Sequence, residues 1–382
     1  MKKIWAALTG YVRATDKWLI FLWVGASAAS VLFLYGLYTS DLASKSTVLK
    51  QVAAIAMGFV AAVVISLFDY HTLLKLWKLY MPLALLLVGL TFFIGTGTRT
   101  DEAWINIPLG PFSFSLQPSE VLKISFITTI ALHLSKVHEN MNAPLNVLLL
   151  CVHGGVHVLL IQLQGDSGSA LVFLVIFIVM LFFAGISWKY IAAAVVLLVP
   201  LVLVVWFFIM TPDQQMRFRI VQNPELDSAY AYQQMQGKLA LGVGGVQGTG
   251  IFSGRHVRVP EIYNDFIFSF IGEATGFMGC LGVIMLLTAI CFKILYNSSL
   301  AADNTGRFVC VGVFAMMLAQ TIMNVGMCIG VLPVIGVTLP LFSAGGTSVI
   351  SLYLALGLVL SVYRHSSTGL FYNEVGAPKE VF

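Results

Sequence analysis

Residues 168–185 read GSALVFLVIFIVMLFFAG, a run of eighteen positions without a charged side chain. As a helix rising 1.5 Å per residue, the run would extend about 27 Å, close to the roughly 30 Å hydrocarbon core of a bilayer. Its apolar residues are continuous rather than spaced at helical or alternating intervals, which favours a lipid-facing helix over a barrel strand. The stretch therefore predicts a membrane-spanning helix.

The rest of the chain has the same character. Of its 382 residues, 59% are hydrophobic and only 10% are charged, whereas a soluble domain has roughly 25% charged residues. Such a chain cannot cover itself with a water-facing surface. The net charge is +4, but the basic residues are scattered between the apolar runs rather than clustered, so nucleic-acid binding is not indicated. We expect an all-α integral membrane protein.

Ten apolar runs are long enough to cross a bilayer. They lie at about 18–38, 48–68, 77–95, 117–135, 145–163, 168–185, 188–210, 265–292, 307–330 and 345–363. The sequence shows no internal repeat or low-complexity tract. A single transmembrane domain over residues 1–382, built as a bundle of about ten helices, is the simplest prediction.

Lysine and arginine predict the orientation, because short cytoplasmic loops carry an excess of both. If the N-terminus is cytoplasmic, the short outer loops hold only Lys45, Lys50 and Arg99. The inner side then holds twelve basic residues: Lys2, Lys3, Arg13, Lys17, Lys75, Lys78, Lys136, Lys189, Lys293, Arg307, Arg364 and Lys379. Both termini are therefore expected in the cytoplasm.

One long segment, residues 211–264, falls on the outer side between the seventh and eighth predicted spans. Loops of this length without evident structure of their own are usually functional. This one reads as partly amphipathic or re-entrant, because an apolar, glycine-rich stretch follows its lysine. Its basic residues are Arg217, Arg219, Lys238, Arg255 and Arg258.

A charged residue inside a membrane-spanning helix costs roughly 2.5–3.5 kcal/mol on insertion scales, so Glu120, Lys123 and Glu273 each need an explanation. Glu120 and Lys123 are three residues apart and can pair on one helix face. Glu273 lies eight residues after Asp265, about 12 Å deeper in a continuous helix. Two interpretations stay open: the charges fix helix packing, or they line a polar cavity open to the outer face.

Asp265 starts an apolar run directly after Asn264. A helix beginning there can use Asn264 as its cap, and the helix dipole favours an ionised carboxylate. An ionised aspartate at the membrane boundary, beside a basic loop, can serve as a general base. The alternative interpretation is an ordinary capping acid.

Two further signals are weaker. Asp166 lies in a tight glycine-rich turn, where an aspartate is usually part of the turn chemistry. His153 and His157 are four residues apart, which suits a metal, but no third ligand stands nearby in the sequence, so packing or hydrogen bonding is favoured. The apolar segment 330–348 contains two prolines and four glycines, and such broken backbone is tolerated in a membrane only when it is buried or lines a cavity.

Four motifs, in order along nearly the whole chain, together resemble the RodA/FtsW/SpoVE (SEDS) peptidoglycan glycosyltransferases. They are Trp104-Ile105 with QPSE at 117–120 and Lys123, QGDSGSALV at 164–172, PEIYNDFIF at 260–268 after Tyr232-Gln233, and LPVIGVTLPLFSAGGTS at 332–348. Any one of these motifs alone is weak. Their order, and their place on one side of the predicted membrane, make the resemblance specific.

The resemblance implies a ten-helix bundle that polymerises lipid II at the outer face of the bacterial cytoplasmic membrane, with a class B penicillin-binding protein as partner. It assigns the catalytic carboxylate to Asp265. The short termini lean toward a RodA-like role in elongation, with a division or sporulation role left open. No metal site is expected, and a divalent cation stays open. Candidate substrate-binding residues are Glu120, Lys123, Asp166, Arg217, Lys238, Arg255, Arg258, Glu261, Glu273 and Ser343.

The sequence also departs from the family pattern. Ala344 stands where the family has tyrosine, Gly165 and Ser167 replace a proline and a leucine, and Ala103 replaces an arginine. Arg99 is a candidate to replace that missing cation. A flippase that moves lipid-linked precursors, or a scaffold without activity, are the competing hypotheses, but the unusual polar groups gather at the outer end, which favours catalysis there.

Overall fold

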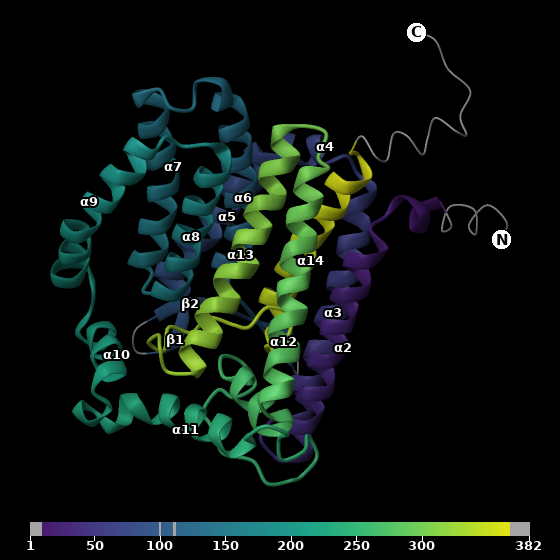
Figure 1. Cartoon of the computed structure of the whole chain (residues 1–382), viewed down its shortest axis with the longest axis vertical. Helices are drawn as coiled ribbons and strands as arrows, with labels where there is room; N and C mark the ends of the chain where they lie inside the picture. The colour runs from purple at the N-terminus through teal and green to yellow at the C-terminus, as the bar shows by residue number, and fades with distance from the viewer. Residues whose placement is uncertain (1–9, 99–100, 110–111, 367–382) are drawn as a thin grey trace.

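The computed structural model describes residues 10–98, 101–109 and 112–366, and its helices form one elongated bundle (Figure 1). Nine helical segments of the described part are long and apolar enough to cross a membrane. They are α2 (Lys17–Thr39), α3 (Lys45–Leu67), α5 (Trp77–Ile94), α7 (Pro144–Leu163), α8 (Ser167–Ala184), α9 (Trp188–Val204) continued by the π-helical turn η2 (Val205–Ile209), α12 (Ile267–Ser299), α13 (Asn304–Cys328) and α14 (Gly346–Arg364). The prediction of a helical membrane protein is confirmed.

The remaining predicted span, 117–135, corresponds to α6 (Pro118–Val137), which is long enough to cross but more polar than the others. It packs against α5, α7, α8, α13 and α14, and most of its side chains are buried. A helix enclosed by other helices needs no lipid-facing surface, so it can carry polar side chains that pair inside the bundle. By contrast, α9 lies at the edge of the bundle (Figure 1), and none of the side chains of its apolar window that the structure describes is buried.

One end of the bundle carries structure that the apolar runs did not predict. An antiparallel sheet of order β1-β2-β3 joins α5 to α6, formed by Thr96–Thr98, Asp101–Leu109 and Phe112–Leu116. The segment expected as a long loop contains α10 (Pro212–Gln222), the short 3₁₀ turn η3 (Pro224–Leu226) and α11 (Ser228–Gly244). We call this end of the bundle the sheet end, and Figure 1 shows α11 crossing it. The short α4 (Tyr70–Lys75) and η1 (His138–Asn140) are the remaining elements.

Both new helices have local start signals. The side chain of Thr211 accepts the N–H of Gln214, and the Gln214 side chain accepts the N–H of Thr211, which forms a capping box at the start of α10. Asp227 caps α11 by accepting the N–H groups of Ala229 and Tyr230. The segment predicted as a long, partly amphipathic loop therefore contains two capped helices.

Glu120 and Lys123 form an ion pair inside the bundle. The Lys123 Nζ lies 2.7 Å from Glu120 Oε1, and the two side chains are 2% and 5% exposed, respectively. Ser351 on α14 donates to the other carboxylate oxygen, Oε2, at 2.9 Å. The pair therefore links α6 to α14, which matches the packing interpretation of these charges.

His133 on α6 lies beside the histidine pair of α7. Its Nδ1 is 3.2 Å from the Nδ1 of His153, and the Nδ1 of His157 is 2.7 Å from the His153 carbonyl oxygen. His133, which is distant from this pair in the sequence, comes close to it because α6 and α7 pack side by side. Even so, no group of three or more His, Cys, Asp or Glu side chains within the described ranges is arranged to hold a metal ion.

Replacing Glu120 with glutamine is expected to lower the free energy of unfolding by about 3–5 kcal/mol, because it leaves the Lys123 ammonium buried without an opposite charge. The measurement is unfolding of the purified protein in mixed detergent micelles. The double variant Glu120→Leu/Lys123→Met removes both charges and should recover most of the loss. Equal stability of Glu120→Gln and wild type would show that the pair does not hold the bundle together.

Candidate active site

Asp265 lies in a tight turn at the sheet end that leads into α12. Glu261 has a φ of 52°, an uncommon backbone conformation for a residue other than glycine, and its carbonyl oxygen accepts the N–H of Asp265 at 3.1 Å. Helix α12 begins at Ile267, with Phe266 at the N-cap and no side-chain cap. The predicted capping role of Asn264 is therefore wrong, and its amide instead donates to the Glu261 carboxylate at 2.8 Å.

The backbone of Asp265 is held by Asn324, a fully buried residue of α13. The Asn324 Nδ2 donates to the carbonyl oxygen of Asp265 at 2.7 Å and to that of Val337 at 2.8 Å. The Asn324 amide thus donates hydrogen bonds to two carbonyl groups that lie outside the helices, one from each of the two segments that meet here.

The segment between α13 and α14 makes two further hydrogen bonds to the turn. The Ser343 hydroxyl donates to the carbonyl oxygen of Asn264 at 2.5 Å, and the N–H of Ala344 donates to that of Tyr263 at 2.7 Å. Gln51 on α3 supports the segment from behind by donating to the Ser343 carbonyl oxygen at 3.1 Å. Ser343 is buried in this contact and does not line a described cavity, so it supports the turn that carries Asp265.

A cavity of about 340 Å³ opens beside Asp265, and we call it the Asp265 cavity. Its polar lining gathers four of the predicted site residues from three separate parts of the chain, namely Asp166, Arg217 and the pair Glu261 and Asp265. It also contains amides and hydroxyls that were not predicted: Gln117, Ser167, Gln214, Asn264, Thr338 and Ser348. Three carboxylates and one guanidinium therefore face a common space.

Asp166 has the structural role that its turn predicted and also faces this cavity. Its Oδ1 caps α8 by accepting the N–H of Ser169 at 2.8 Å, and its Oδ2 accepts a hydrogen bond from Gln117 at 2.9 Å. Gly165 precedes it with a φ of 91°, in the region that favours glycine. That conformation explains why glycine stands where the family pattern has proline, since proline is fixed near −65°.

Arg217 reaches the cavity from α10. The Gln214 side chain, one turn earlier, donates to the Ser167 hydroxyl at 2.9 Å and so ties α10 to the start of α8. The Arg217 Nη1 also lies 3.4 Å from the carbonyl oxygen of Val334. A guanidinium held this way is suited to an anionic group, because it offers several donors in a fixed plane.

The structure keeps other predicted residues away from the Asp265 cavity. Lys238 is exposed on α11, where its side chain packs on Gly330. Arg255 and Arg258 are also exposed, and Arg258 lines a different hollow with Asp41. Glu120 and Lys123 form an ion pair with each other deeper along α6.

Glu273 is also absent from the cavity lining, because it holds the segment between α11 and α12. Its Oε1 accepts the N–H of Val257 at 2.8 Å and lies 3.5 Å from the His256 Nδ1. Its carbonyl oxygen accepts the N–H of Thr249 at 2.8 Å. Both the Glu273 and His256 side chains are almost fully buried, so this geometry favours the packing interpretation.

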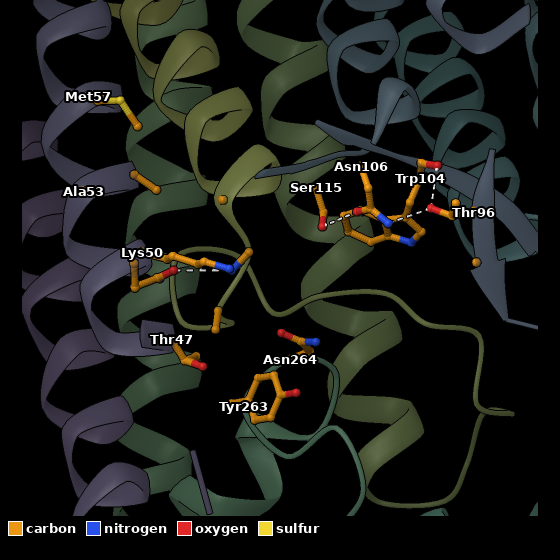
Figure 2. Close-up of a pocket in the computed structure, with 16 residues that line it drawn as sticks. Thr47, Lys50, Ala53, Met57, Thr96, Trp104, Asn106, Ser115, Tyr263 and Asn264 are labelled. Atoms are coloured by element: carbon orange, nitrogen blue, oxygen red, sulfur yellow. Dashed lines mark hydrogen bonds between the residues drawn. The ribbon is translucent and has the colours of Figure 1, made fainter. Parts of the chain in front are cut away.

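A second cavity, of about 690 Å³ and shown in Figure 2, adjoins the Asp265 cavity. We call it the Lys50 cavity. It shares five lining residues with the Asp265 cavity: Gly97, Trp104, Asn264, Ala344 and Gly345. Lys50 was predicted only as a basic residue of a short outer loop, and its position at the end of an apolar run is the one sequence feature that points to the cavity. Arg99, the suggested substitute cation, lies outside the described residues.

Tyr263 lines the Lys50 cavity from the turn before Asp265. Partial burial, together with the Glu261 carboxylate nearby, raises the pKa of its hydroxyl above the usual value near 10. The phenol therefore remains protonated, and able to donate a hydrogen bond, throughout the physiological range.

Comparison with known proteins gives consistent results. Residues 17–368 match the FtsW/RodA/SpoVE family, described as cell cycle proteins. The peptidoglycan glycosyltransferase MrdB of Escherichia coli K12 is 30% identical over 325 residues, covering 83% of this chain and 85% of that protein. Stage V sporulation protein E of Bacillus subtilis is 31% identical over 330 residues, covering 83% and 87%.

Solved structures agree with the sequence comparison. A peptidoglycan synthase complex, described as coordinating polymerization and crosslinking, contains a chain with a TM-score of 0.77 and 26% identity. The rod shape determining protein RodA of Thermus thermophilus gives a TM-score of 0.69 and 27% identity. Each match covers 92% of this chain and 98% of the other. With the motifs, the fold and the sequence in agreement, the chain belongs to the FtsW/RodA/SpoVE (SEDS) family.

Proposed function

We propose that this protein is a peptidoglycan glycosyltransferase that polymerises lipid II at the outer face of a bacterial cytoplasmic membrane, with both termini in the cytoplasm. The observation that carries the proposal is the Asp265 carboxylate, which lies on a fixed backbone in a cavity that it shares with Arg217. The family relatives that are named peptidoglycan glycosyltransferases support it. The excess of lysine and arginine in the short loops at the other end of the bundle from Asp265 supports this orientation.

The reaction requires a sugar hydroxyl to attack an anomeric carbon that carries a polyprenyl pyrophosphate. Asp265 takes the proton of the attacking hydroxyl as a new glycosidic bond forms and the bond to the pyrophosphate breaks. Catalysis of this kind is typically worth about 10²–10⁴-fold in rate. With one base and no covalent nucleophile, the displacement inverts the anomeric configuration.

Arg217 is suited to the departing pyrophosphate, which gains negative charge as the bond breaks. A guanidinium donates two parallel hydrogen bonds to phosphate oxygens and keeps its charge at any physiological pH. Stabilising charge that develops in the transition state is usually the largest catalytic contribution. We therefore place the donor, which carries the leaving group, in the Asp265 cavity.

A class B penicillin-binding protein is the proposed partner, with cell-wall elongation as the proposed role. The similarity to a chain of a peptidoglycan synthase complex supports a transpeptidase partner, since that complex is described as coupling polymerization to crosslinking. The similarity to RodA supports elongation.

Asp265→Asn should lower the rate of lipid II polymerisation by the purified protein by about 10²–10⁴-fold, because an amide cannot accept the proton. The measurement is the amount of labelled glycan polymer with and without the partner. Asp41→Asn is the matched control: Asp41 is exposed at the sheet end with a φ of 55°, which asparagine tolerates. Full polymer from Asp265→Asn would exclude Asp265 as the base, and transbilayer movement of lipid II that survives the substitution would favour a flippase.

Arg217→Ala should lower kcat for polymerisation by about tenfold to a thousandfold, because the leaving pyrophosphate loses its cation. Arg219→Ala, on the same helix, should leave kcat within about twofold, since Arg219 is exposed beside Trp206 rather than in the cavity. Equal effects of the two substitutions would argue against a specific role of Arg217. Loss of all activity on chelation would assign the role to a divalent cation instead.

Asn324→Ala should lower kcat by about tenfold to a hundredfold with KM nearly unchanged, because it releases the backbone that positions Asp265. The Asn324→Asp variant keeps the side-chain shape but cannot donate these hydrogen bonds, so it should lower kcat by a similar factor. Gln320→Ala removes another buried amide one turn earlier on α13 and controls for lost stability. If Gln320→Ala lowers kcat as much, Asn324 is merely structural.

A further inference from the structure

Helix α12, which begins two residues after Asp265, is not continuous. Gly276 has a φ of 69° and a ψ of −167°, a conformation that is essentially restricted to glycine. It separates the first part of α12, residues 267–275, from the longer part, residues 277–299. We call the first part the Asp265 half-helix. The direction of the longer part therefore does not by itself determine the direction of the half-helix that leads from the base.

Residues 245–250 supply hydrogen bonds on both sides of this break. In an unbroken helix, the N–H groups of residues 277 and 278 would donate to the carbonyl oxygens of residues 273 and 274. Here all four of these groups are paired with residues 245–250. The N–H groups of Thr249 and Gly250 donate to the oxygens of Glu273 and Ala274 at 2.8 and 2.9 Å, and the N–H groups of Phe277 and Met278 donate to the oxygens of Gly245 and Val246 at 2.9 and 3.3 Å. Each group is therefore satisfied from outside α12.

The close approach at this junction depends on two glycines. A Cβ atom added to Gly248 would clash with the carbonyl oxygen of Ala274, and one added to Gly276 would clash with that of Val246. Gly248 also has a φ of 81°, in the region that favours glycine. The backbone of residues 245–250 therefore lies directly against the end of the Asp265 half-helix, with no side chain between them.

Side chains fasten the residues that follow to the same half-helix. The Glu273 carboxylate accepts the N–H of Val257 at 2.8 Å and lies 3.5 Å from the His256 Nδ1. The His256 ring packs edge-on against Phe270, with ring centroids 4.9 Å apart. The His256 and Glu273 side chains are 0% and 1% exposed, so water does not compete for these contacts. Residues 245–257 and the half-helix are thus joined by main-chain and side-chain contacts.

We propose that residues 245–257 are a positioning segment for the base, a proposal that rests on the proposed function. They set the direction of the Asp265 half-helix at its far end, while Asn324 holds the backbone at Asp265 itself. None of residues 245–257, all of which the structure describes, lines the Asp265 cavity or the Lys50 cavity. The segment therefore acts through Asp265 rather than on the substrate. A misplacement of about 1 Å can lower the rate about 10²-fold, so this support controls catalysis from outside the cavity.

The Gly248→Ala variant of the full-length protein in nanodiscs tests the proposal, because the added methyl group pushes the segment away from the half-helix. It should lower kcat for polymerisation of labelled lipid II by about tenfold to a hundredfold and leave KM within about twofold. Gly185→Ala is the matched control: Gly185 follows α8 with a φ of 91°, and a Cβ atom there meets nothing within 4 Å. It imposes similar backbone strain without a clash, so it should leave kcat within about twofold.

A second pair of variants addresses the side-chain contact and decides the question if Gly248→Ala does not fold. Glu273→Leu cannot accept the N–H of Val257, so it should lower kcat by about tenfold or more with little change in KM. Glu273→Gln keeps an acceptor oxygen and should recover most of that loss. Thermal unfolding of each variant, measured alongside the rates, separates lost catalysis from lost folded protein.

The outcomes separate this inference from the proposed function. Wild-type kcat in folded Gly248→Ala, or an equal fall in Gly248→Ala and Gly185→Ala, would overturn the positioning role. Equal kcat values in folded Glu273→Leu and Glu273→Gln would also overturn it, as would a rise in KM that accounts for the whole loss of rate. In each of these cases the wild-type chain still polymerises lipid II, and the proposed function stands. A wild-type chain that forms no polymer would remove the function and the positioning role together.

Discussion

The side-chain amide of Asn324 holds together the two irregular segments on which the active site depends. Both segments lie at an end of a membrane bundle, where an unsatisfied carbonyl group costs several kcal/mol if water is excluded. By donating to Asp265 and Val337 at once, Asn324 lets the chain leave helical geometry on both sides of the cavity. The hydrogen bonds from Ser343 and Ala344 then align the same two segments. Without this contact, the turn that carries the carboxylate would depend on the hydrogen bonds from Ser343 and Ala344 for its position.

The positions of the helices follow from the sequence because lipid imposes a simple rule: continuous apolar runs of about twenty residues must be helices. The rule does not extend to the sheet end. The pairing of Asn106 with Ser115 is a contact between strands, and strand pairing depends on context more than on propensity. Helix α10 was predictable in part, since Thr211 and Gln214 have capping-box spacing, but its polar sequence has no apolar run to attract attention.

The candidate site divides in a similar way. The motifs located Asp166, Glu261 and Asp265, the predicted outer loop supplied Arg217, and the fold brings these residues to one cavity. Spacing alone could not decide whether a charged residue in a helix faces a partner or a cavity. For Lys123 the answer depends on Glu120, and for Glu273 it depends on His256 and Val257, which come from a segment that the sequence could not place. Lys50 could not be recognised as a cavity residue from the sequence, because the strands that form the opposite wall of its cavity are placed there only by the fold.

The contact of Gln51 with the segment after α13 gives the site a mechanical property. Gln51 follows Lys50 on α3, donates to the Ser343 carbonyl oxygen and accepts the N–H of Gly345 at 3.3 Å. Ser343 in turn bonds the residue before Asp265. A force that moves α3 sideways at the Lys50 cavity is therefore transmitted through two consecutive hydrogen bonds to the backbone next to the base. The two cavities are thus mechanically coupled, because a displacement of α3 at one cavity moves the backbone that carries the carboxylate in the other.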